Sequence, residues 1–342
     1  MQQLFVLAGG RIEWVEQEDP QATDCFVGIE TKASGVSVGT ETKFIRRWQK
    51  QSQGRRDLGY SAAGVVTEIG SVAAERTGLQ AGARVACYGG PYTRHATRLA
   101  VPWTLVSPMP DGVSFEEAAF CGIGAIAMHA IRRGAFTGGE RVLVFGMGIL
   151  GQLAEQMLRA WGCRTMAVDR HGEHLELAAR MGCPHVFDTR DGDVVAAALR
   201  FAPGGVDGVI VNTGLQPPAM NQAAAACRER GRIVMVGGGK IEIDRGDVFE
   251  KEIDLLISRA GGPGRYDDQY ERDGRDLSPA WVRWTEGRNV DEFIQMVASG
   301  QINMKDLITH RFPRQDAAKA FALLLDAANK YSTMGVVFRY GA

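Results

Sequence analysis

The chain has 342 residues, of which 45% are hydrophobic, and its 39 lysines and arginines nearly balance its 40 aspartates and glutamates. This length exceeds the roughly 250–300 residues at which single cores stop growing, so we expect two domains. A near-neutral chain lacks the excess positive charge that would attract nucleic acids or anionic membranes, so we expect neither as a partner. No segment approaches the ~20 apolar residues of a membrane span. Residues 1–10 are too short and uncharged for a secretory signal, so we expect a cytoplasmic protein.

The first third of the chain is rich in glycine and in β-type runs. Residues 26–31, 63–69 and 82–87 are typical of strands, so we expect a compact β domain over residues 1–113. At Ser114 the pattern changes, because a serine followed three residues later by Glu117 forms a capping box and predicts a helix start.

Residues 146–151 lie directly between an apolar run, residues 142–145, and a helix-type segment, residues 152–158. In such a turn the first glycine permits the tight bend, the second lets backbone approach a pyrophosphate, and the third lets helix pack on strand. The helix N-terminus then offers free N–H groups to the phosphates. The sequence predicts a dinucleotide cradle formed by Gly146, Met147, Gly148, Ile149, Leu150 and Gly151.

Asp169 ends the next apolar segment, residues 164–168, at about the 20-residue interval where an acid accepts hydrogen bonds from the adenosine ribose. It should accept from the 2′- and 3′-hydroxyls and repel a 2′-phosphate, which favours NAD over NADP. Arg170 follows and could stack on adenine or neutralise a phosphate. The alternative is a structural glycine turn with an unrelated surface aspartate.

Strands and helices alternate through the rest of this region, which indicates βαβ units and a parallel sheet wound on both faces. We expect helices over residues 173–181, 194–201 and 220–230, strands over 186–187, 206–211 and 232–236, and an edge strand over 249–257. Two more helices are expected over residues 290–299 and 316–329.

Residues 261–288 form an aromatic and arginine-rich excursion without a clear period. Such side chains suit a substrate-side loop, and equally a surface loop or a contact between subunits. The candidate substrate contacts are Arg265, Tyr266, Tyr270, Trp281 and Arg283.

The chain resembles the medium-chain dehydrogenase/reductases, which are related to zinc-type alcohol, polyol and threonine dehydrogenases. The likeness rests on the dinucleotide turn and on residues 35–41, 58–66 and 82–85. Residues 262–267, 282–286 and 307–312 are similar to a subgroup that includes the dehydrogenase half of bi-domain oxidoreductases. The Gly39-Thr40-Glu41 element also resembles that of bacteriochlorophyllide dehydrogenases.

This resemblance implies an α/β fold in which a Rossmann domain is inserted into a GroES-like β-rich catalytic domain. We place the Rossmann domain at residues 114–300 and the returning catalytic segment at residues 301–342. The family would have its active site in the cleft between them, consistent with ligands lying beyond the carboxyl ends of the strands. It would bring Asn212, Thr213, Gly237 and Gly238 close to the cofactor and assemble as a homodimer or homotetramer.

The chain departs from the zinc enzymes at their metal ligands, of which a catalytic zinc needs three. Val38, or Ser37, stands at the position of the first cysteine, and Tyr60 stands at that of the ligand histidine. Only Cys121 falls near a ligand position, and the six cysteines contain no Cys-x-x-Cys pair, which is typical of reduced, buried thiols. We therefore expect no metal, with a zinc site of Cys121, His95 and Glu41 as the alternative.

Without zinc, side chains must manage the proton and the charge at the reacting oxygen. Tyr60 is the first candidate, with a buried tyrosine of satisfied hydroxyl as its alternative. His95 is the second, and the alternative is a core or surface histidine. Thr40 corresponds to a hydroxyl that relays protons in the zinc enzymes, and the alternative is a turn residue that bonds to backbone. Glu41 would orient the neighbouring groups or pair with an arginine.

We therefore predict a zinc-independent, NAD-dependent oxidoreductase that interconverts a secondary alcohol and a ketone on a sugar, cyclitol or amino-polyol. The nearest rival is a reductase of a conjugated double bond, which would prefer NADPH. A third possibility is an epimerase or a non-redox descendant that retains NAD.

Overall fold

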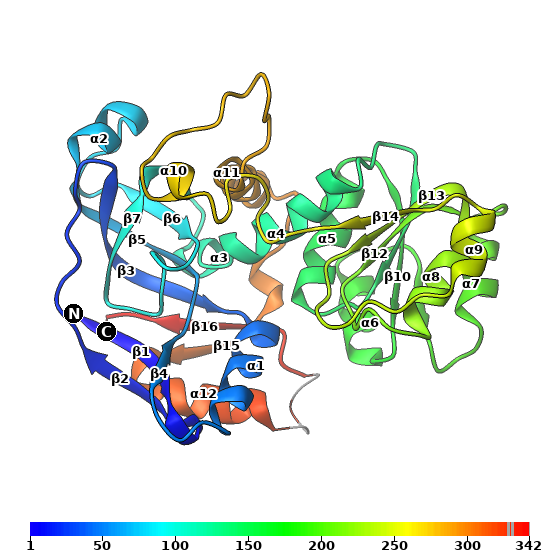
Figure 1. The fold of residues 1–342 in the computed structure, drawn as a ribbon, viewed down its shortest axis with the longest axis horizontal. Coiled ribbons are helices and arrows are strands. Elements are labelled where there is room, and N and C mark those ends of the chain that lie inside the picture. Colours follow the sequence, from blue (N-terminus) through cyan, green and yellow to red (C-terminus); the bar gives the residue numbers. More distant parts are fainter. Residues whose placement is uncertain (327–328, 330–331, 342) are drawn as a thin grey trace. The chain divides into compact units, whose positions relative to one another are not determined.

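The computed structural model describes residues 1–326, 329 and 332–341, and the chain divides into two compact units (Figure 1). Unit 1 comprises Met1–Ala125 and Gly261–Ala342, and unit 2 comprises Ile126–Ala260. Residues 261–300, which we expect in the Rossmann domain from the sequence, belong to unit 1 in the structure. The reason is packing: the Phe293 ring covers Gly124, and Ser107 Oγ donates to Asp291 at 3.0 Å.

Unit 1 is built on two sheets (Figure 1). A three-stranded antiparallel sheet has the order β2-β1-β4, from β1 (Gln2–Leu7), β2 (Ile12–Glu16) and β4 (Arg55–Asp57). A seven-stranded sheet has the order β15-β16-β3-β5-β6-β8, with β7 paired to β3. Its strands are β3 (Phe26–Val36), β5 (Ser61–Ile69), β6 (Arg84–Tyr88), β7 (Arg98–Pro102), β8 (Val106–Pro108), β15 (Ile308–Pro313) and β16 (Gly335–Arg339). Since β16 pairs antiparallel with β3, the last strand of the chain returns to the first domain.

The helices of unit 1 include α1, which begins after Ser37, and α3, which has the expected capping box of Ser114 and Glu117. Their bounds are α1 (Val38–Trp48), α2 (Ser71–Thr77), α3 (Phe115–Ala118), α10 (Asp268–Glu271), α11 (Glu286–Ala298) and α12 (Ala317–Leu325). Short 3-10 turns occur at Ala8–Gly10, Trp103–Leu105, Lys305–Leu307 and Arg314–Asp316. The expected helix 316–329 ends at Leu325, and its residues 327–328 lie outside the described residues.

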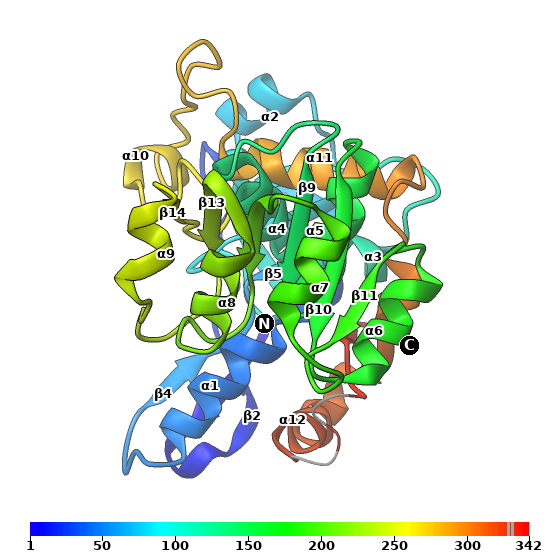
Figure 2. The same ribbon diagram turned by 90° about the vertical axis from the view of Figure 1, so that its right-hand side faces the viewer.

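Unit 2 carries one six-stranded sheet, which Figure 2 shows from the side. All its pairs are parallel, in the order β11-β10-β9-β12-β13-β14. The strands are β9 (Arg141–Phe145), β10 (Arg164–Asp169), β11 (Val186–Asp188), β12 (Val206–Val211), β13 (Cys227–Met235) and β14 (Asp254–Ile257). If the strands of unit 2 are numbered 1 to 6 along the chain, starting at β9, their order across the sheet is 3-2-1-4-5-6. The direction in which successive strands are added therefore reverses between β9 and β12, as in dinucleotide-binding folds.

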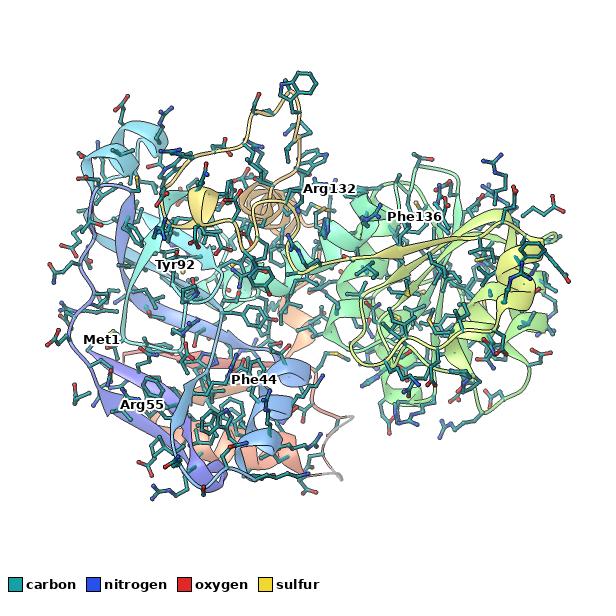
Figure 3. All side chains as sticks on the ribbon, in the orientation of Figure 1. Met1, Phe44, Arg55, Tyr92, Arg132 and Phe136 are labelled. Atoms are coloured by element: carbon teal, nitrogen blue, oxygen red, sulfur yellow. The ribbon has the colours of Figure 1, made fainter. Side chains whose placement is uncertain are left out.

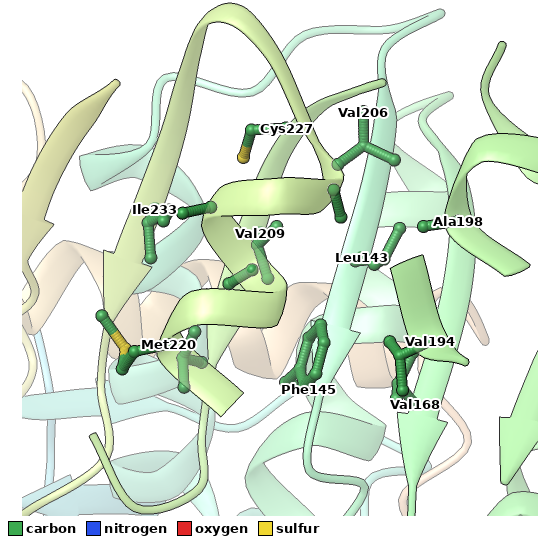
Figure 4. Packing of buried hydrophobic residues seen from close by; sticks show 14 of the residues in the cluster. Leu143, Phe145, Val168, Val194, Ala198, Val206, Val209, Met220, Cys227 and Ile233 are labelled. Atoms are coloured by element: carbon green, nitrogen blue, oxygen red, sulfur yellow. The ribbon is translucent and has the colours of Figure 1, made fainter. Parts of the chain in front are cut away.

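Helices cover both faces of this sheet, because α5 and α6 pack on β9 to β11 while α7 and α8 pack on β10, β12 and β13. They are α5 (Ile149–Ala160), α6 (Gly172–Arg180), α7 (Val194–Phe201), α8 (Ala219–Ala226) and α9 (Arg245–Glu250), and α4 (Cys121–Arg133) spans the division between the units. Figure 4 shows Leu143 and Phe145 in the core beneath α7 and α8. The alternate residues Val142 and Val144 are also fully buried, as a doubly covered strand requires.

An aromatic ring explains one glycine inside the sheet. A side chain on Gly208 of β12 would meet the ring of Phe136, which Figure 3 labels, at 2.6 Å. The Arg232 guanidinium lies over the same ring at 5.0 Å. The missing side chain at Gly208 therefore leaves room for the Phe136 ring to pack against β12.

Two expected elements of unit 2 were wrong in extent. The helix predicted over 220–230 ends at Ala226, because Lys251 Nζ takes up the carbonyls of Ala224 and Ala225 and the chain continues as β13. The edge strand predicted over 249–257 is only β14, since Phe249 lies in α9 beneath the Arg245 guanidinium. Within the described residues, no helix is long and apolar enough to cross a membrane.

Candidate functional site

The glycine turn joins β9 to α5, and two of its glycines are required by close packing. Gly146 has a φ of +88°, and a side chain there would meet Thr213 Cγ2 at 2.5 Å. A side chain on Gly151 would meet the Gly146 carbonyl oxygen at 2.0 Å. Gly148 differs, because a side chain there would meet nothing within 4 Å. The backbone of Gly148 is therefore open to an approaching ligand.

The N-terminus of α5 is not capped by a side chain. In the described chain the N–H groups of Gly148, Ile149, Leu150 and Gly151 donate to no acceptor, and the first helical bond runs from Gln152 N to Gly148 O at 2.9 Å. Four N–H groups at a helix N-terminus, reinforced by the helix dipole, form an anion site. The turn has the donors that a pyrophosphate needs.

Asp169 lies at the carboxyl end of β10, and its carboxylate is tied to the glycine turn. Its Oδ2 accepts from Met147 N at 2.6 Å and contacts His174 Nδ1 at 3.2 Å, while Oδ1 accepts from Arg170 N and His171 N at 2.7 and 3.0 Å. Burial alone would raise the pKa of Asp169, but the hydrogen bonds from His174 and Met147 hold it below its ordinary value. The carboxylate is therefore negative at neutral pH.

The carboxyl ends of β12 and β13 place the remaining predicted cofactor residues beside the turn. Both side-chain polar atoms of Asn212 are buried without a hydrogen-bond partner among the described residues. A side chain added at Gly151 would lie 3.5 Å from Asn212 Nδ2. A side chain on Gly237 would meet the Thr213 carbonyl oxygen at 1.7 Å, so Gly237 and Thr213 are in close backbone contact. Gly238 follows and is exposed. An unpartnered buried amide beside open N–H groups fits an adenine dinucleotide.

In unit 1, Tyr60 and two hydroxyls of the α1 N-terminus come together. Tyr60 OH donates to Ser37 Oγ at 2.8 Å, and the exposed Thr40 also hydrogen-bonds to the phenol. Burial raises the pKa of Tyr60 well above its ordinary value, and the negative charge of Glu41 adds to the shift. The phenol is therefore neutral and can donate a proton, whereas a phenolate base is disfavoured.

Glu41 and His95 lie inside unit 1 rather than at a surface. His95 is 0% exposed, its Nε2 lies 3.0 Å from Glu41 Oε2, and its Nδ1 lies 2.7 Å from Ser34 Oγ. Ser34 Oγ in turn lies 2.8 Å from Tyr340 OH. Glu41 Oε1 accepts from Ser37 N at 2.7 Å, which fixes the residue that holds Tyr60. Both ring nitrogens of His95 are occupied, so it does not reach a ligand and instead supports the start of α1.

Ser34 and Tyr340 were not among the site residues predicted from the sequence. Ser37 was considered only as the residue at the position of the first ligand cysteine. Ser37 could have been found, because it directly precedes α1 and lies three residues before Thr40. Tyr340 has no local signal, since it joins the network only when the C-terminal segment pairs with β3.

We expect four phenols of unit 1, three buried and that of Tyr60 partly buried, to make the protein less stable in alkali. Burial is the largest cause that raises the pKa of Tyr60, Tyr88, Tyr270 and Tyr340. Above about pH 10 the unfolded phenols lose protons while the folded ones keep them, so the free energy of unfolding falls by up to about 1.4 kcal/mol per pH unit for each. Urea unfolding at pH 8 and near pH 11 measures this loss. Equal stability at both values would contradict it.

The three side chains of the alternative zinc site, Cys121, His95 and Glu41, do not come together among the described residues. No three His, Cys, Asp or Glu side chains gather as a metal site anywhere in the described chain. Glu41 and His95 do meet, but Cys121 lies apart from them, donating to the Cys87 carbonyl at 3.3 Å and contacting Ser61 Oγ at 3.5 Å. Burial raises the pKa of Cys121 to about 12, which disfavours the thiolate that a metal would bind.

The excursion of residues 261–288 separates into buried and exposed candidates. Tyr270 is 2% exposed and its hydroxyl bonds to Thr285 Oγ1 at 2.9 Å, so it belongs to the core of unit 1. Arg265 is largely buried against Glu271. Tyr266, Trp281 and Arg283 are exposed, Trp281 to 90%. Of the five predicted substrate contacts, these three therefore have exposed side chains.

Comparisons with known proteins agree with this geometry. The profile of a family described as zinc-binding dehydrogenase matches residues 150–273. A probable D-xylulose reductase A of Neosartorya fischeri is 26% identical, with 93% of this chain and 92% of the relative aligned. An alcohol dehydrogenase of Rhizobium meliloti is 30% identical over 58% of each chain. A sorbitol dehydrogenase of Bacillus subtilis is 26% identical over 65% of this chain and 57% of its own.

Solved structures share the fold over the whole chain. Galactitol-1-phosphate dehydrogenase of Escherichia coli superposes with a TM-score of 0.79 at 18% identity, covering 99% of this chain and 100% of the other. An Escherichia coli oxidoreductase of unknown specificity gives a TM-score of 0.82 at 18% identity, covering 100% and 99%. The architecture of a Rossmann-like unit with a β-rich unit is therefore confirmed.

Proposed function

Because this chain belongs to the zinc-binding dehydrogenase family, we propose that it interconverts a secondary alcohol and a ketone with NAD, without a zinc ion. The chain is an alcohol dehydrogenase-like enzyme. The observation that supports the finer proposal is Tyr60, a neutral phenol held by the hydroxyls of Ser37 and Thr40, together with the lack of a group of three metal ligands among the described residues.

The cofactor residues are all in unit 2. The N–H groups of the 148–151 turn would hold the pyrophosphate, Asp169 would accept from the ribose hydroxyls, and Asn212 would find its partner in the nucleotide. The nicotinamide, when bound, supplies the site that gives or takes the hydride. The negative charge of Asp169 favours NAD over NADP. The positive charge of the adjacent Arg170 opposes this preference, because it could neutralise a 2′-phosphate.

The proton is handled by the chain itself. In the direction of reduction, Tyr60 gives its phenolic proton to the carbonyl oxygen, and the hydroxyls of Ser37 and Thr40 turn to donate to the phenol oxygen as it becomes negative. Glu41 and His95 hold Ser37 in place through the bond from Ser37 N to Glu41 Oε1. Because the neutral phenol is stabilised, we propose reduction of the ketone as the favoured role of Tyr60.

Two measurements test the cofactor and the metal together. We expect NADH to bind and react better than NADPH near pH 8, and metal analysis of the purified protein to show substoichiometric zinc. A preference of about tenfold or more for NADPH would favour the double-bond reductase, whose site lacks the acid. Stoichiometric zinc would contradict the role of Tyr60. Bound NAD without net NADH formation from any alcohol would favour the epimerase.

A polar substrate is supported by the relatives, whose names refer to D-xylulose and sorbitol. Of the predicted substrate contacts, the exposed Tyr266, Trp281 and Arg283 remain our candidates as stacking surfaces and donors. We propose the cytoplasm as the place of action, supported by six free cysteines of the kind that a reducing compartment maintains.

We propose a homodimer, because the edge strand β14 exposes apolar side chains. Leu255 and Ile257 are 38% and 59% exposed, and an uncovered edge of this kind favours pairing with another strand. Ile257→Lys should convert the assembly to monomers in light-scattering chromatography. The exposed Leu199→Lys of α7 is the control and should leave the assembly unchanged. A wild-type monomer, or a dimer that survives Ile257→Lys, would contradict this interface.

A further inference from the structure

The stretch that forms α1 and β4 carries a local excess of positive charge, although the whole chain has a net charge of −1. Residues 42–56 contain six lysines and arginines and no aspartate or glutamate. The acids at its two ends are engaged elsewhere, Glu41 with His95 and Asp57 with Arg94. The six exposed cations, none of which forms an ion pair within the described part of the chain, are Lys43, Arg46, Arg47, Lys50, Arg55 and Arg56.

Four of these cations form a single stripe along α1. Lys43, Arg46, Arg47 and Lys50 follow the spacing i, i+3, i+4 and i+7, which places them on one face of a helix. The buried Ile45 belongs to the inward face of the same helix. A hollow in the surface of α1 is lined by Arg46, Arg47, Gln49 and Lys50. The stripe therefore offers several donors to one anion, with no paired acid to displace.

The two arginines of β4 are held against aromatic rings. The Arg56 guanidinium lies over the ring of Phe44 at 4.0 Å, and that of Arg55 lies over the ring of Phe5 at 4.4 Å. Figure 3 labels Phe44 and Arg55. A cation–π contact holds a guanidinium in place and leaves its charge unchanged. These two arginines therefore add to the positive potential, while the donors available to a ligand are those of α1.

The stripe begins beside the groups that we propose for proton transfer. The exposed Thr40 hydrogen-bonds to the Tyr60 phenol, and Lys43 and Arg47 follow three and seven residues later, on the face of α1 that carries Thr40. Because a helix rises 1.5 Å per residue, Lys43 lies about 5 Å and Arg47 about 10 Å beyond Thr40 along the axis. Their long side chains can therefore bind an anionic group of a molecule whose reacting oxygen lies at Tyr60.

We propose that the substrate is an anionic polyol or the corresponding ketone, whose carboxylate or phosphate binds Lys43 and Arg47 while its reacting oxygen meets Tyr60. Arg46 and Lys50 add to the attraction. A small anion fits better than a long polyanion, because the stripe spans only about 10 Å and starts at the reacting phenol. One exposed ion pair contributes little in water, so the cations act together.

The inference rests on the proposed alcohol–ketone reaction, so binding is measured separately from turnover. The probes are sorbitol, its carboxylate counterpart gluconate, and sorbitol 6-phosphate, each titrated calorimetrically into the full chain at low salt. We expect at least one of the two anions to bind about tenfold more tightly than sorbitol, and about 0.5 M NaCl to remove most of this difference. Tighter binding of the phosphate identifies a phosphorylated substrate, and tighter binding of gluconate a sugar acid.

The double variant Lys43→Gln/Arg47→Gln should bind the anions no better than sorbitol and should bind sorbitol as the wild type does. Arg47→Lys, which keeps the charge, should keep most of the preference. Arg76→Gln is the matched control, because it removes an exposed arginine from α2, which lies apart from α1 in Figures 1 and 2. It should leave the affinity for every probe unchanged.

A wild type that does not bind the anions better than sorbitol would overturn the inference, and so would unchanged anion binding in the double variant. Turnover of neutral polyols with NAD would in that case leave the proposed function intact. Anion binding that depends on Lys43 and Arg47, without NADH formation from any polyol, would instead contradict the proposed function and keep the anion site. For an anionic substrate that is turned over, the double variant should raise KM about tenfold at unchanged kcat. Melting curves identify any variant that does not fold.

Discussion

Tyr60→Phe should lower kcat for ketone reduction by about 10²–10⁴-fold, the range that a proton-transferring side chain contributes. The substitution keeps the ring and its edge-on contact with Tyr88 at 5.9 Å and removes only the hydroxyl that donates to Ser37. KM and the dissociation constant for NADH should change little, because the residues that we propose for cofactor binding belong to unit 2. Steady-state kinetics with a polyol-derived ketone that the wild type reduces provide the measurement.

The pH profile adds an independent check on Tyr60. Since burial raises the pKa of this phenol above its ordinary value of about 10, ionisation of the proton donor should not slow reduction at any pH below 10. Tyr92→Phe is the matched control, because Tyr92 packs edge-on against Phe26 in the same unit and should keep full activity. A kcat for Tyr60→Phe within about threefold of the wild type would remove Tyr60 as the proton donor.

Gly148→Val should weaken NADH binding by at least about 100-fold while the protein remains folded. A side chain at Gly148 meets no atom within 4 Å, and the φ of −63° and ψ of 179° are open to any residue. The added methyl groups would, however, cover the N–H groups of the 148–151 turn that we assign to the pyrophosphate. Calorimetric titration with NADH gives the loss of binding, and a melting curve shows that folding is kept.

Two further glycines serve as controls for this prediction. Gly246→Val also points into open space, on α9 of the same unit, and should leave NADH binding unchanged. Gly151→Val should destabilise the protein itself, because its side chain would meet the Gly146 carbonyl. Wild-type affinity in Gly148→Val would show that the phosphates do not lie at this turn.

The parallel-sheet fold of unit 2 was predictable because its signals are local. A glycine turn between a strand and a helix, with an acid ending the next strand, specifies backbone geometry within about 25 residues. The structure accordingly shows Gly146 at positive φ and Asp169 bound to the turn through Met147 N–H. Element ends were less predictable where a distant residue intervened, as when Lys251 takes up the last carbonyls of α8.

The sequence by itself determined the parallel sheet and the glycine turn between its first strand and α5, because both depend on residue type and spacing along the chain. Only the tertiary structure decided that His95 is buried against Glu41 and that Tyr270 lies in the core. It also decided that Tyr60 meets Ser37, and that Tyr340 closes a network with Ser34 from the far end of the chain. These contacts join residues up to 306 positions apart, and strand pairing at that separation leaves no periodic signal in the local sequence.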